Sequence, residues 1–277
     1  MRIPKYWAKG KYPTDAPRPF IAWQWSDTSL QQAQQLADVK AQDIARRFHN
    51  GIRLDRYTYD RNPIREEIVR GINNANGNEI GIITRNTYGA LVLNAVNAMF
   101  IDIDFPDKNA LASGIGKLFG SKTPSPDLAY LQKIEQWSQR NPGLGLRVYR
   151  TFGGLRCLVT NEIFDPTRDA SLALLRQLES DPLYITLCKQ QASFRARLTP
   201  KPWRCDWRNP PSRFPWDNPR QEQVYRQWEN AYNQKSARYT TCRLVKELGR
   251  AETHPDVAPI LQLHDEMACA VDHRNLA

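Results

Sequence analysis

The amino-acid sequence predicts an α+β fold, on three observations. The chain has 277 residues, which is long enough to bury a sizeable core as one large domain or two small ones. Its composition, with 41% hydrophobic, 10% aromatic and 25% charged residues, is that of a globular protein. Short alternating apolar runs, typical of strands, stand between longer amphipathic stretches, typical of helices.

The first part, residues 1–95, is expected to form an N-terminal α/β lobe. The run RPFIAWQW (18–25) predicts a strand, and the amphipathic residues after it predict a helix that Ser26 or Asp27 caps. PIREEIVRGI (63–72) predicts a short helix, because it carries proline in its first turn. An Asn-Gly turn signal then precedes two further strands.

The second part, residues 96–208, has predicted elements in the order β-α-β-β-α-β. The strands are expected at 100–105, 144–152, 154–160 and 194–199, and the helices at 125–140 and 169–193. This order is the split βαβ arrangement of an RRM-like palm. We expect the four strands to form one antiparallel sheet with strand 100–105 at its centre. Helices would cover one face and leave the other open for a substrate.

The last part, residues 209–277, is expected to be a helical C-terminal tail. Pro-rich loops lead into RQEQVYRQWENAYNQK and further predicted helices. The three parts either fold as distinct units or pack into one compact domain. No stretch reaches the length of a membrane span, and the N-terminal residues lack the apolar segment of an export signal. A cytoplasmic protein without a membrane partner is therefore expected.

The charge balance favours a polyanionic partner. Lys and Arg total 39 against 29 Asp and Glu, a net charge of +10. In KPWRCDWRNPPSRFPW (201–216) aromatic residues lie among the cations, so guanidinium groups could contact phosphates while rings stack on bases. The alternative is a Pro-rich surface loop whose tryptophans pack on the core. The five cysteines and four histidines are scattered, which argues against a structural zinc site or a disulfide framework.

Two aspartates stand inside the apolar run FIDIDFP (100–106). Because the side chains of a strand alternate between its faces, Ile101 and Ile103 should face one way, and Asp102 and Asp104 the other. Two neighbouring carboxylates repel each other, so a cation is expected beside them. Mg²⁺ or Mn²⁺ would suit this place, because such metals bind one or two carboxylates together with substrate phosphates.

A salt-bridged acidic pair without a metal is the other interpretation. FRARLTPKPWR (194–204) carries Arg195 and Arg197 on one face of a short predicted strand, with Lys201 and Arg204 just beyond it. If this strand lies next to strand 100–105, its cations would neutralise the aspartates directly.

The hairpin RVYRTFGGLRCLV (147–159) carries a second set of candidate residues. Its two glycines permit close approach of the backbone to a ligand. Its arginines suit triphosphate or backbone phosphate, and its threonine offers a hydroxyl. The alternative is a surface hairpin with solvated arginines. The candidates for nucleotide binding are Arg150, Thr151, Gly153, Gly154 and Arg156.

Together these features resemble the archaeo-eukaryotic primase–polymerase superfamily. In that family an acid-x-acid motif ends the first strand of an RRM-like palm, and Asp102-Ile-Asp104 is similar to it. A later hairpin of the family carries approximately S-x-x-G-x-H. The corresponding residues here are Thr151-Phe-Gly-Gly154-Leu-Arg156, with arginine in place of the nucleotide-binding histidine.

The family also has a third acid later in the chain. Asp206 is the candidate here, while Asp181 stands at a predicted helix start, where capping explains it. The resemblance covers residues 100–206.

The resemblance implies a metal-dependent nucleotidyl transferase of primase or polymerase type, acting on nucleic acid with a nucleoside triphosphate. Asp102, Asp104 and Asp206 would be catalytic, and the first two would hold Mg²⁺ or Mn²⁺. Single-stranded or template–primer nucleic acid would follow the basic and aromatic residues Arg195, Arg197, Lys201, Trp203, Arg204 and Arg208. The alternative is a nucleic-acid-binding protein on the same fold without catalysis, in which the acids are structural and Arg156 marks lost activity.

Overall fold

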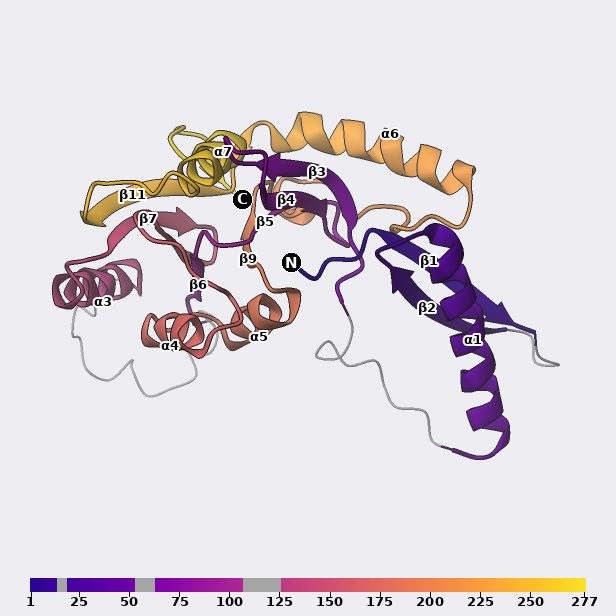
Figure 1. Cartoon of the computed structure of the whole chain (residues 1–277). Coiled ribbons are helices and arrows are strands. Elements are labelled where there is room, and N and C mark those ends of the chain that lie inside the picture. Colours follow the sequence, from indigo (N-terminus) through magenta and orange to yellow (C-terminus); the bar gives the residue numbers. More distant parts are fainter. Residues whose placement is uncertain (14–18, 53–62, 107–125) are drawn as a thin grey trace, which may run out of the picture.

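Two four-stranded antiparallel sheets form the centre of the molecule (Figure 1). The computed structural model describes residues 1–13, 19–52, 63–106 and 126–277. The first sheet contains, in spatial order, β11 (Cys242–Gly249), β7 (Gly145–Thr151), β8 (Gly154–Val159) and β6 (Phe100–Asp104). The second contains β3 (Glu67–Asn73), β4 (Glu79–Arg85), β5 (Leu91–Ala95) and β9 (Phe194–Arg197). The predicted α+β class is confirmed.

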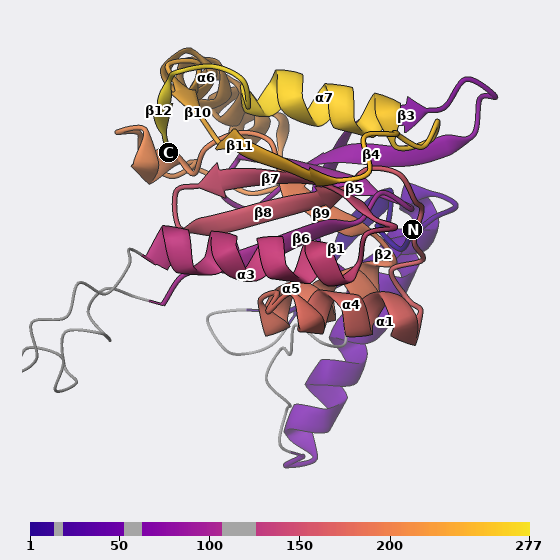
Figure 2. The same ribbon diagram turned by 90° about the vertical axis from the view of Figure 1, so that its left-hand side faces the viewer.

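Helices cover both faces of the first sheet. On one side lie α3 (Pro126–Arg140), α4 (Asp169–Gln177) and α5 (Pro182–Gln191), and on the other lies α7 (Ala258–Ala268), as Figure 2 shows. Ile134 of α3, Leu172 of α4 and Ile260 of α7 are buried in the shared core. The sheet face that was expected to be open to a substrate is thus covered by α7, which returns to the sheet after β11. No helix within the described ranges is long and apolar enough to cross a bilayer.

The fourth strand of the predicted palm belongs to the second sheet. β9 pairs with β5 rather than with β6, although it runs next to β6. The prediction that these four strands share one sheet, with 100–105 at its centre, is therefore wrong. β6 is an edge strand, and the start of α5 occupies its outer edge. There the Ser180 hydroxyl and the Asp181 N–H donate to the Asp102 carbonyl oxygen at 2.9 and 3.0 Å.

Two segments differ in kind from their prediction. Residues 63–72, predicted as a short helix, contain most of β3. Their β-branched residues suit a strand, and pairing with β4 outweighs the local signal of the proline. Residues 209–277 contain α6 (Pro219–Ser236) and α7, but also β11 and the short strands β10 (Tyr239–Thr240) and β12 (Asn275–Leu276). This part is therefore not wholly helical, and it supplies one strand of the first sheet.

Among the described residues, side chains cap the N-termini of α5 and α6, but not those of α4 and α7. α1 (Leu30–His49) is capped by Ser29, a few residues later than predicted. The helical region predicted over 169–193 contains two helices, α4 and α5, as DASLALLRQLES and PLYITLCKQQASF indicate, and Glu179 between them adopts a left-handed conformation with φ 55°. Asp181 then caps α5, which confirms the helix-capping role predicted for it.

The N-terminal hairpin of β1 (Tyr6–Tyr12) and β2 (Phe20–Ser26) carries α1 and projects from the two main sheets (Figure 1). A Cβ on Gly10 would lie 2.0 Å from the Ala37 carbonyl oxygen, so glycine permits the close approach of hairpin and helix. Lys9 Nζ lies 2.8 Å from Asp217 Oδ1 and ties the hairpin to the loop before α6. The buried residues of α1 are small: Ala33, Ala37, Ala41 and Ala45.

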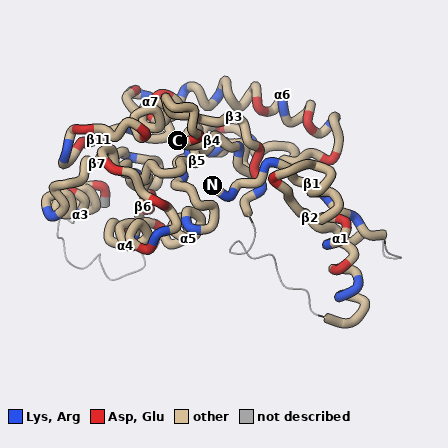
Figure 3. Tube along the Cα trace, viewed as in Figure 1, with Lys and Arg blue, Asp and Glu red and all other residues tan. Residues whose placement is uncertain are grey.

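α6 lies along the second sheet and carries charges of both signs along its length (Figure 3). Arg85 of β4 is 7% exposed and pairs with Glu67 of β3 at 3.3 Å and with Glu229 of α6. Arg226 of α6 pairs with Glu229 at 2.9 Å and also with Glu67. Several cations that contribute to the net charge of +10 are thus engaged within the fold.

Candidate functional site

The two aspartates of the FIDIDFP motif lie at the C-terminal end of β6. Asp102 is directly opposite Arg156 on the neighbouring strand β8. Ile101 and Ile103 are 0% and 1% exposed and face the core, so the predicted alternation is confirmed. The carboxylates lie on the opposite face, where Asp102 is half-buried and Asp104 is at the surface.

Among the described residues, the nearest cation to Asp102 is Arg156. Its Nε lies 3.6 Å from Asp102 Oδ1, and its side chain is 4% exposed. Its Nη1 donates to the carbonyl oxygen of Arg197 at 2.9 Å, which holds the side chain between β8 and β9. Nε makes no hydrogen bond within the described residues. A buried and incompletely paired guanidinium therefore faces Asp102, at the position where the family resemblance expects histidine.

Arg195, proposed above as a partner of the aspartates or of nucleic acid, lies in a different environment. Its Nη2 is 2.9 Å from Glu66 Oε1, and its Nη1 donates to Asn94 Oδ1 at 2.8 Å. The side chains of Arg195 and Glu66 are 11% and 4% exposed, so this ion pair belongs to the core of the second sheet. Arg208 is exposed, and its guanidinium lies 5.8 Å over the ring of Trp207.

Three further cations come from β9 and the segment after it. Burial, together with the charge of Arg156, lowers the pKa of Arg197 to about 10. The Nε of Arg197 has no hydrogen-bond partner in the described part of the chain. Burial and the neighbouring guanidinium groups lower the pKa of Lys201, and burial lowers that of Arg204. Asp104 opposes both shifts, so these cations feel its charge.

The carboxyl group of Asp104 has the opposite perturbation. Partial burial raises its pKa, and the charges of Asp102 and Asp181 raise it further. Lys201 and Arg197 act against this rise without cancelling it. Burial and the two neighbouring acids together therefore outweigh the neighbouring cations in their effect on the pKa of Asp104.

Gly153 lies where the acidic and basic groups meet. A Cβ at this position would lie 3.9 Å from both Asp104 Oδ1 and Arg204 Nη2. The Gly153 carbonyl oxygen accepts from the Phe105 N–H at 2.9 Å, which ties the hairpin tip to the end of β6. The missing side chain leaves the backbone accessible beside both charges.

The other hairpin residues hold the turn together. A Cβ on Gly154 would lie 1.8 Å from the Ile103 carbonyl oxygen, so glycine is required for β8 to pair with β6. Thr151 Oγ1 accepts from the Gly154 N–H at 3.0 Å. Arg150 Nε lies 2.9 Å from Asp127 Oδ2, on the side of the hairpin next to α3. These contacts occupy Arg150 and Thr151, both predicted to bind nucleotide.

The third acid is placed differently from the prediction. Asp206 is exposed, with φ 54°, just after the 3-10 turn η1 (Pro202–Arg204). Asp181 caps α5, and its charge also raises the pKa of Asp104. Within the described residues, no group of three or more His, Cys, Asp or Glu side chains is arranged to hold a metal. The acidic centre therefore consists of Asp102 and Asp104.

Exposed aromatic rings border the charged cluster. Trp203 is 47% exposed and meets Tyr88 edge-on, with ring centroids 5.0 Å apart. Lys201 Nζ lies 5.4 Å from the Trp203 ring, and the Arg204 guanidinium lies 4.2 Å from the ring of Phe152. Sequence reasoning found Trp203 but missed the other two rings. The only local signal was the position of Phe152 at the tip of a Gly-Gly hairpin.

A buried histidine behind Arg156 was also missed. His264 of α7 is 0% exposed, with its Nδ1 2.9 Å from Asp265 Oδ1 and its Nε2 3.4 Å from Arg156 Nη1. Burial lowers its pKa to about 4, with Asp265 opposing and Arg156 assisting the shift. The neutral ring donates from Nδ1 to Asp265 and accepts at Nε2 from Arg156. These partners are far apart in sequence, so no motif could reveal the contact.

We expect this histidine to make stability pH-dependent. Its pKa in the folded protein, about 4, lies below the ordinary 6.5, so the unfolded chain binds the proton first as pH falls. Stability should thus be full above pH 6.5 and fall by up to about 3 kcal/mol towards pH 4. Urea unfolding across this range measures the slope. His264→Gln should flatten it, whereas His273→Gln, at an exposed position, should not; equal slopes in all three proteins would contradict the assignment.

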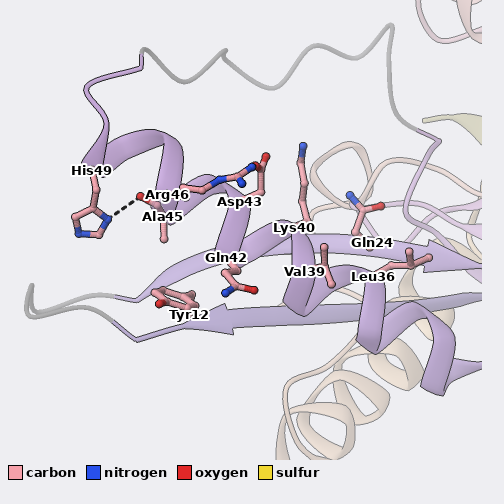
Figure 4. Close-up of a pocket in the computed structure, with 10 residues that line it drawn as sticks. All are labelled: Tyr12, Gln24, Leu36, Val39, Lys40, Gln42, Asp43, Ala45, Arg46 and His49. Carbon is pink, nitrogen blue, oxygen red and sulfur yellow. Dashed lines mark hydrogen bonds and ion pairs between the residues drawn. The ribbon is translucent and has the colours of Figure 1, made fainter.

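A separate hollow of about 750 Å³ lies between α1 and the β1–β2 hairpin (Figure 4). Its wall combines the apolar side chains of Tyr12, Leu36 and Val39 with charged groups such as Lys40 and Asp43. The Asp43 carboxylate is already paired with Arg46 at 2.6 Å. The hollow contains none of the residues singled out by the sequence, and the charged cluster around Asp104 remains the best candidate site.

Comparison of the chain with protein-family models, with curated proteins and with solved structures gives no significant match. The interpretation of the site therefore depends on its own chemistry.

Proposed function

We propose that this protein is a metal-dependent nucleotidyl transferase of primase or polymerase type that acts on nucleic acid. One observation carries the proposal: two adjacent carboxylates, Asp102 and Asp104, face a larger number of cations. Arg156 is 3.6 Å from Asp102. The negative charges of Asp102 and Asp104 also favour the charged forms of Arg197, Lys201 and Arg204. Carboxylates beside surplus positive charge suit a divalent metal together with a polyphosphate.

The donor set fits a divalent cation. Mg²⁺ is commonly held by one or two carboxylates and completes its coordination with substrate phosphates and water. Burial and the charges of Asp102 and Asp181 raise the pKa of Asp104, and a bound cation would act against this rise. Asp102 and Asp104 would hold Mg²⁺ or Mn²⁺. When bound, the metal would neutralise phosphate charge and make the attacking hydroxyl more acidic.

The chain's own cations have a complementary role. Burial and the charge of Arg156 disfavour the charged form of Arg197, and its Nε has no hydrogen-bond partner among the described residues, so a nearby anion would stabilise its charge. Lys201 and Arg204 flank it, and Gly153 leaves backbone accessible between Arg204 and Asp104. These groups would hold the triphosphate and stabilise the charge that develops on it during transfer. Their contribution to catalysis would be positioning and electrostatic stabilisation.

The arrangement of strands supports a modified RRM-like palm. β7, β8 and β6 are neighbours in the order expected for that fold, and α3 and α4 pack on one face. The fourth strand, β9, runs beside β6 but pairs with β5. We propose that this displacement opens the space in which Arg156 reaches the Arg197 carbonyl, 2.9 Å away.

Nucleotide incorporation tests the proposed activity. Wild-type protein is incubated with a template–primer or an unprimed single strand, nucleoside triphosphates, and Mn²⁺, Mg²⁺ or EDTA. We expect products with a metal and none with EDTA, and a rise in melting temperature on adding Mn²⁺. Absence of both products and metal-induced stabilisation, on DNA and on RNA, would overturn the proposal.

A non-catalytic nucleic-acid-binding protein is the second candidate. The observation that favours it is Arg156, which already lies 3.6 Å from Asp102 where the family resemblance expects histidine. In this case the protein would bind nucleic acid but remain indifferent to metal in the same assays.

A further inference from the structure

We propose that the exposed rings beside the acidic centre form a stacking surface for the unpaired bases of a single-stranded nucleic acid. The surface consists of Tyr88, Trp203 and Phe152, with Lys201 beside Trp203 and Arg204 beside Phe152. This inference deepens the proposed function, because it names the form of the substrate strand. The binding itself does not require catalysis.

The three rings are large, exposed and brought together from separate parts of the chain. Tyr88 precedes β5, Phe152 is at the tip of the β7–β8 hairpin and Trp203 is in η1. Their exposed fractions are 42%, 52% and 47%, although Tyr88 and Trp203 pack against each other at 5.0 Å. Two of these exposed rings, Trp203 and Phe152, lie beside a cation, and the third, Tyr88, packs on Trp203, so the surface suits a ligand that is both flat and anionic.

The rings and their cations lie beside the acids. Tyr88 meets Trp203, Lys201 lies 5.4 Å from the Trp203 ring, and Arg204 lies 4.2 Å over Phe152. Arg204 Nη2 and Asp104 Oδ1 each lie 3.9 Å from the position that a Cβ on Gly153 would take. A strand laid along this path would reach the acidic centre with its phosphates near Lys201 and Arg204.

The pairing of Trp203 with Lys201 and of Phe152 with Arg204 suits nucleotides in particular. A base that stacks on Trp203 or Phe152 takes the place of the Lys201 or Arg204 side chain, and the displaced cation can move to the adjacent phosphate. Duplex nucleic acid cannot do this, because its base faces are already stacked. The positive charge of Lys201 and Arg204 also disfavours a basic peptide as the occupant.

Equilibrium binding without metal tests the surface. Fluorescein-labelled (dT)12, (rU)12 and a 12-base-pair duplex are titrated with the full-length protein in EDTA, at two salt concentrations. We expect either single strand to bind at least about tenfold more tightly than the duplex, and affinity to fall as salt rises. The difference between the DNA and RNA strands then shows which sugar the surface prefers.

The ring variants separate stacking from charge. Trp203→Ala and Tyr88→Ala should each weaken single-strand binding by roughly five- to hundredfold, while Trp203→Phe should keep most of it. Arg204→Gln should weaken binding mainly at low salt. Phe48→Ala is the matched control, because Phe48 is 58% exposed on α1.

Two results would overturn this inference. One is equal affinity for single strand and duplex, and the other is unchanged affinity in both Trp203→Ala and Tyr88→Ala. Selective single-strand binding by a protein that shows no nucleotide incorporation would support the surface and contradict only the proposed enzyme. Nucleotide incorporation by a protein whose ring variants bind as tightly as wild type would support the proposed enzyme and contradict only the stacking surface.

Discussion

Replacing Asp104 by asparagine is expected to reduce metal-dependent nucleotide incorporation by on the order of 100-fold or more, without destabilising the metal-free protein. The pKa of Asp104 is raised by partial burial and by the charges of Asp102 and Asp181. Its charged form therefore costs stability in the folded state at neutral pH. Asp104→Asn removes this cost, so the melting temperature should stay unchanged or rise.

The pH dependence of the melting temperature independently checks whether Asp104→Asn stabilises the protein. A carboxyl group with a raised folded-state pKa lowers stability as pH rises from the pKa of the unfolded chain to the raised pKa of the folded protein, so the difference between wild type and Asp104→Asn should grow over this interval and be complete above it. At lower pH, where the group is protonated in both folded and unfolded states, the two proteins should melt alike. Thermal melts over pH 3–8, with and without Mn²⁺, measure both effects.

Asp102→Asn is the matched comparison. It leaves Arg156, which is 4% exposed, without the carboxylate 3.6 Å from its Nε. Removing one partner of a buried charge pair is destabilising, so this variant should melt lower than wild type while also losing activity. Full incorporation by Asp104→Asn would rule out the metal role. A loss of stability in Asp104→Asn equal to that in Asp102→Asn would instead favour a purely structural acidic pair.

Breaking the Arg195–Glu66 pair is expected to have the largest effect on stability. The two groups are 2.9 Å apart and 11% and 4% exposed. Glu66 Oε2 also accepts from the Thr84 hydroxyl at 2.5 Å, and Arg195 donates to Asn94 at 2.8 Å. Arg195→Met would strand a buried carboxylate in this network, at a cost of about 3–5 kcal/mol in the free energy of unfolding.

A double-mutant cycle separates the pair from its surroundings. Urea unfolding of Arg195→Met, Glu66→Gln and the double variant gives the coupling energy. We expect the double variant to be more stable than Arg195→Met, because neither charge is then left alone. The double variant should bind single-stranded nucleic acid as tightly as wild type. A specific loss of binding would instead show that Arg195 contacts nucleic acid, as the sequence predicted.

The elements whose signals are local could be predicted from the sequence. Period-two alternation in FIDID placed Ile101 and Ile103 in the core and Asp102 and Asp104 together on the other face. Apolar spacing identified α3 and α6, and a Gly-Gly turn identified the β7–β8 hairpin. In each case the residues that determine the conformation lie within a few positions of one another.

The composition of the site depended on contacts between distant segments. Asp102 pairs with Arg156 from β8 rather than with Arg195 from β9, because β9 pairs with β5 in the other sheet. α7 covers the sheet face that was expected to be open, and its His264 lies 3.4 Å from Arg156 Nη1. Tyr88 meets Trp203 only because the turn before β5 and η1 converge.

The sequence by itself determined the secondary-structure elements around the acidic pair and the chemical types of the candidate groups, through short-range periodicity and turn residues. Only the tertiary structure decided which cations face which acids and which rings gather beside them. Strand pairing and helix docking depend on the free energy of burying whole apolar faces and of satisfying the backbone hydrogen-bonding groups along whole strand edges. That free energy depends on all the strand edges and apolar faces of the chain that compete for the same partners. It therefore cannot be inferred from a short stretch of sequence.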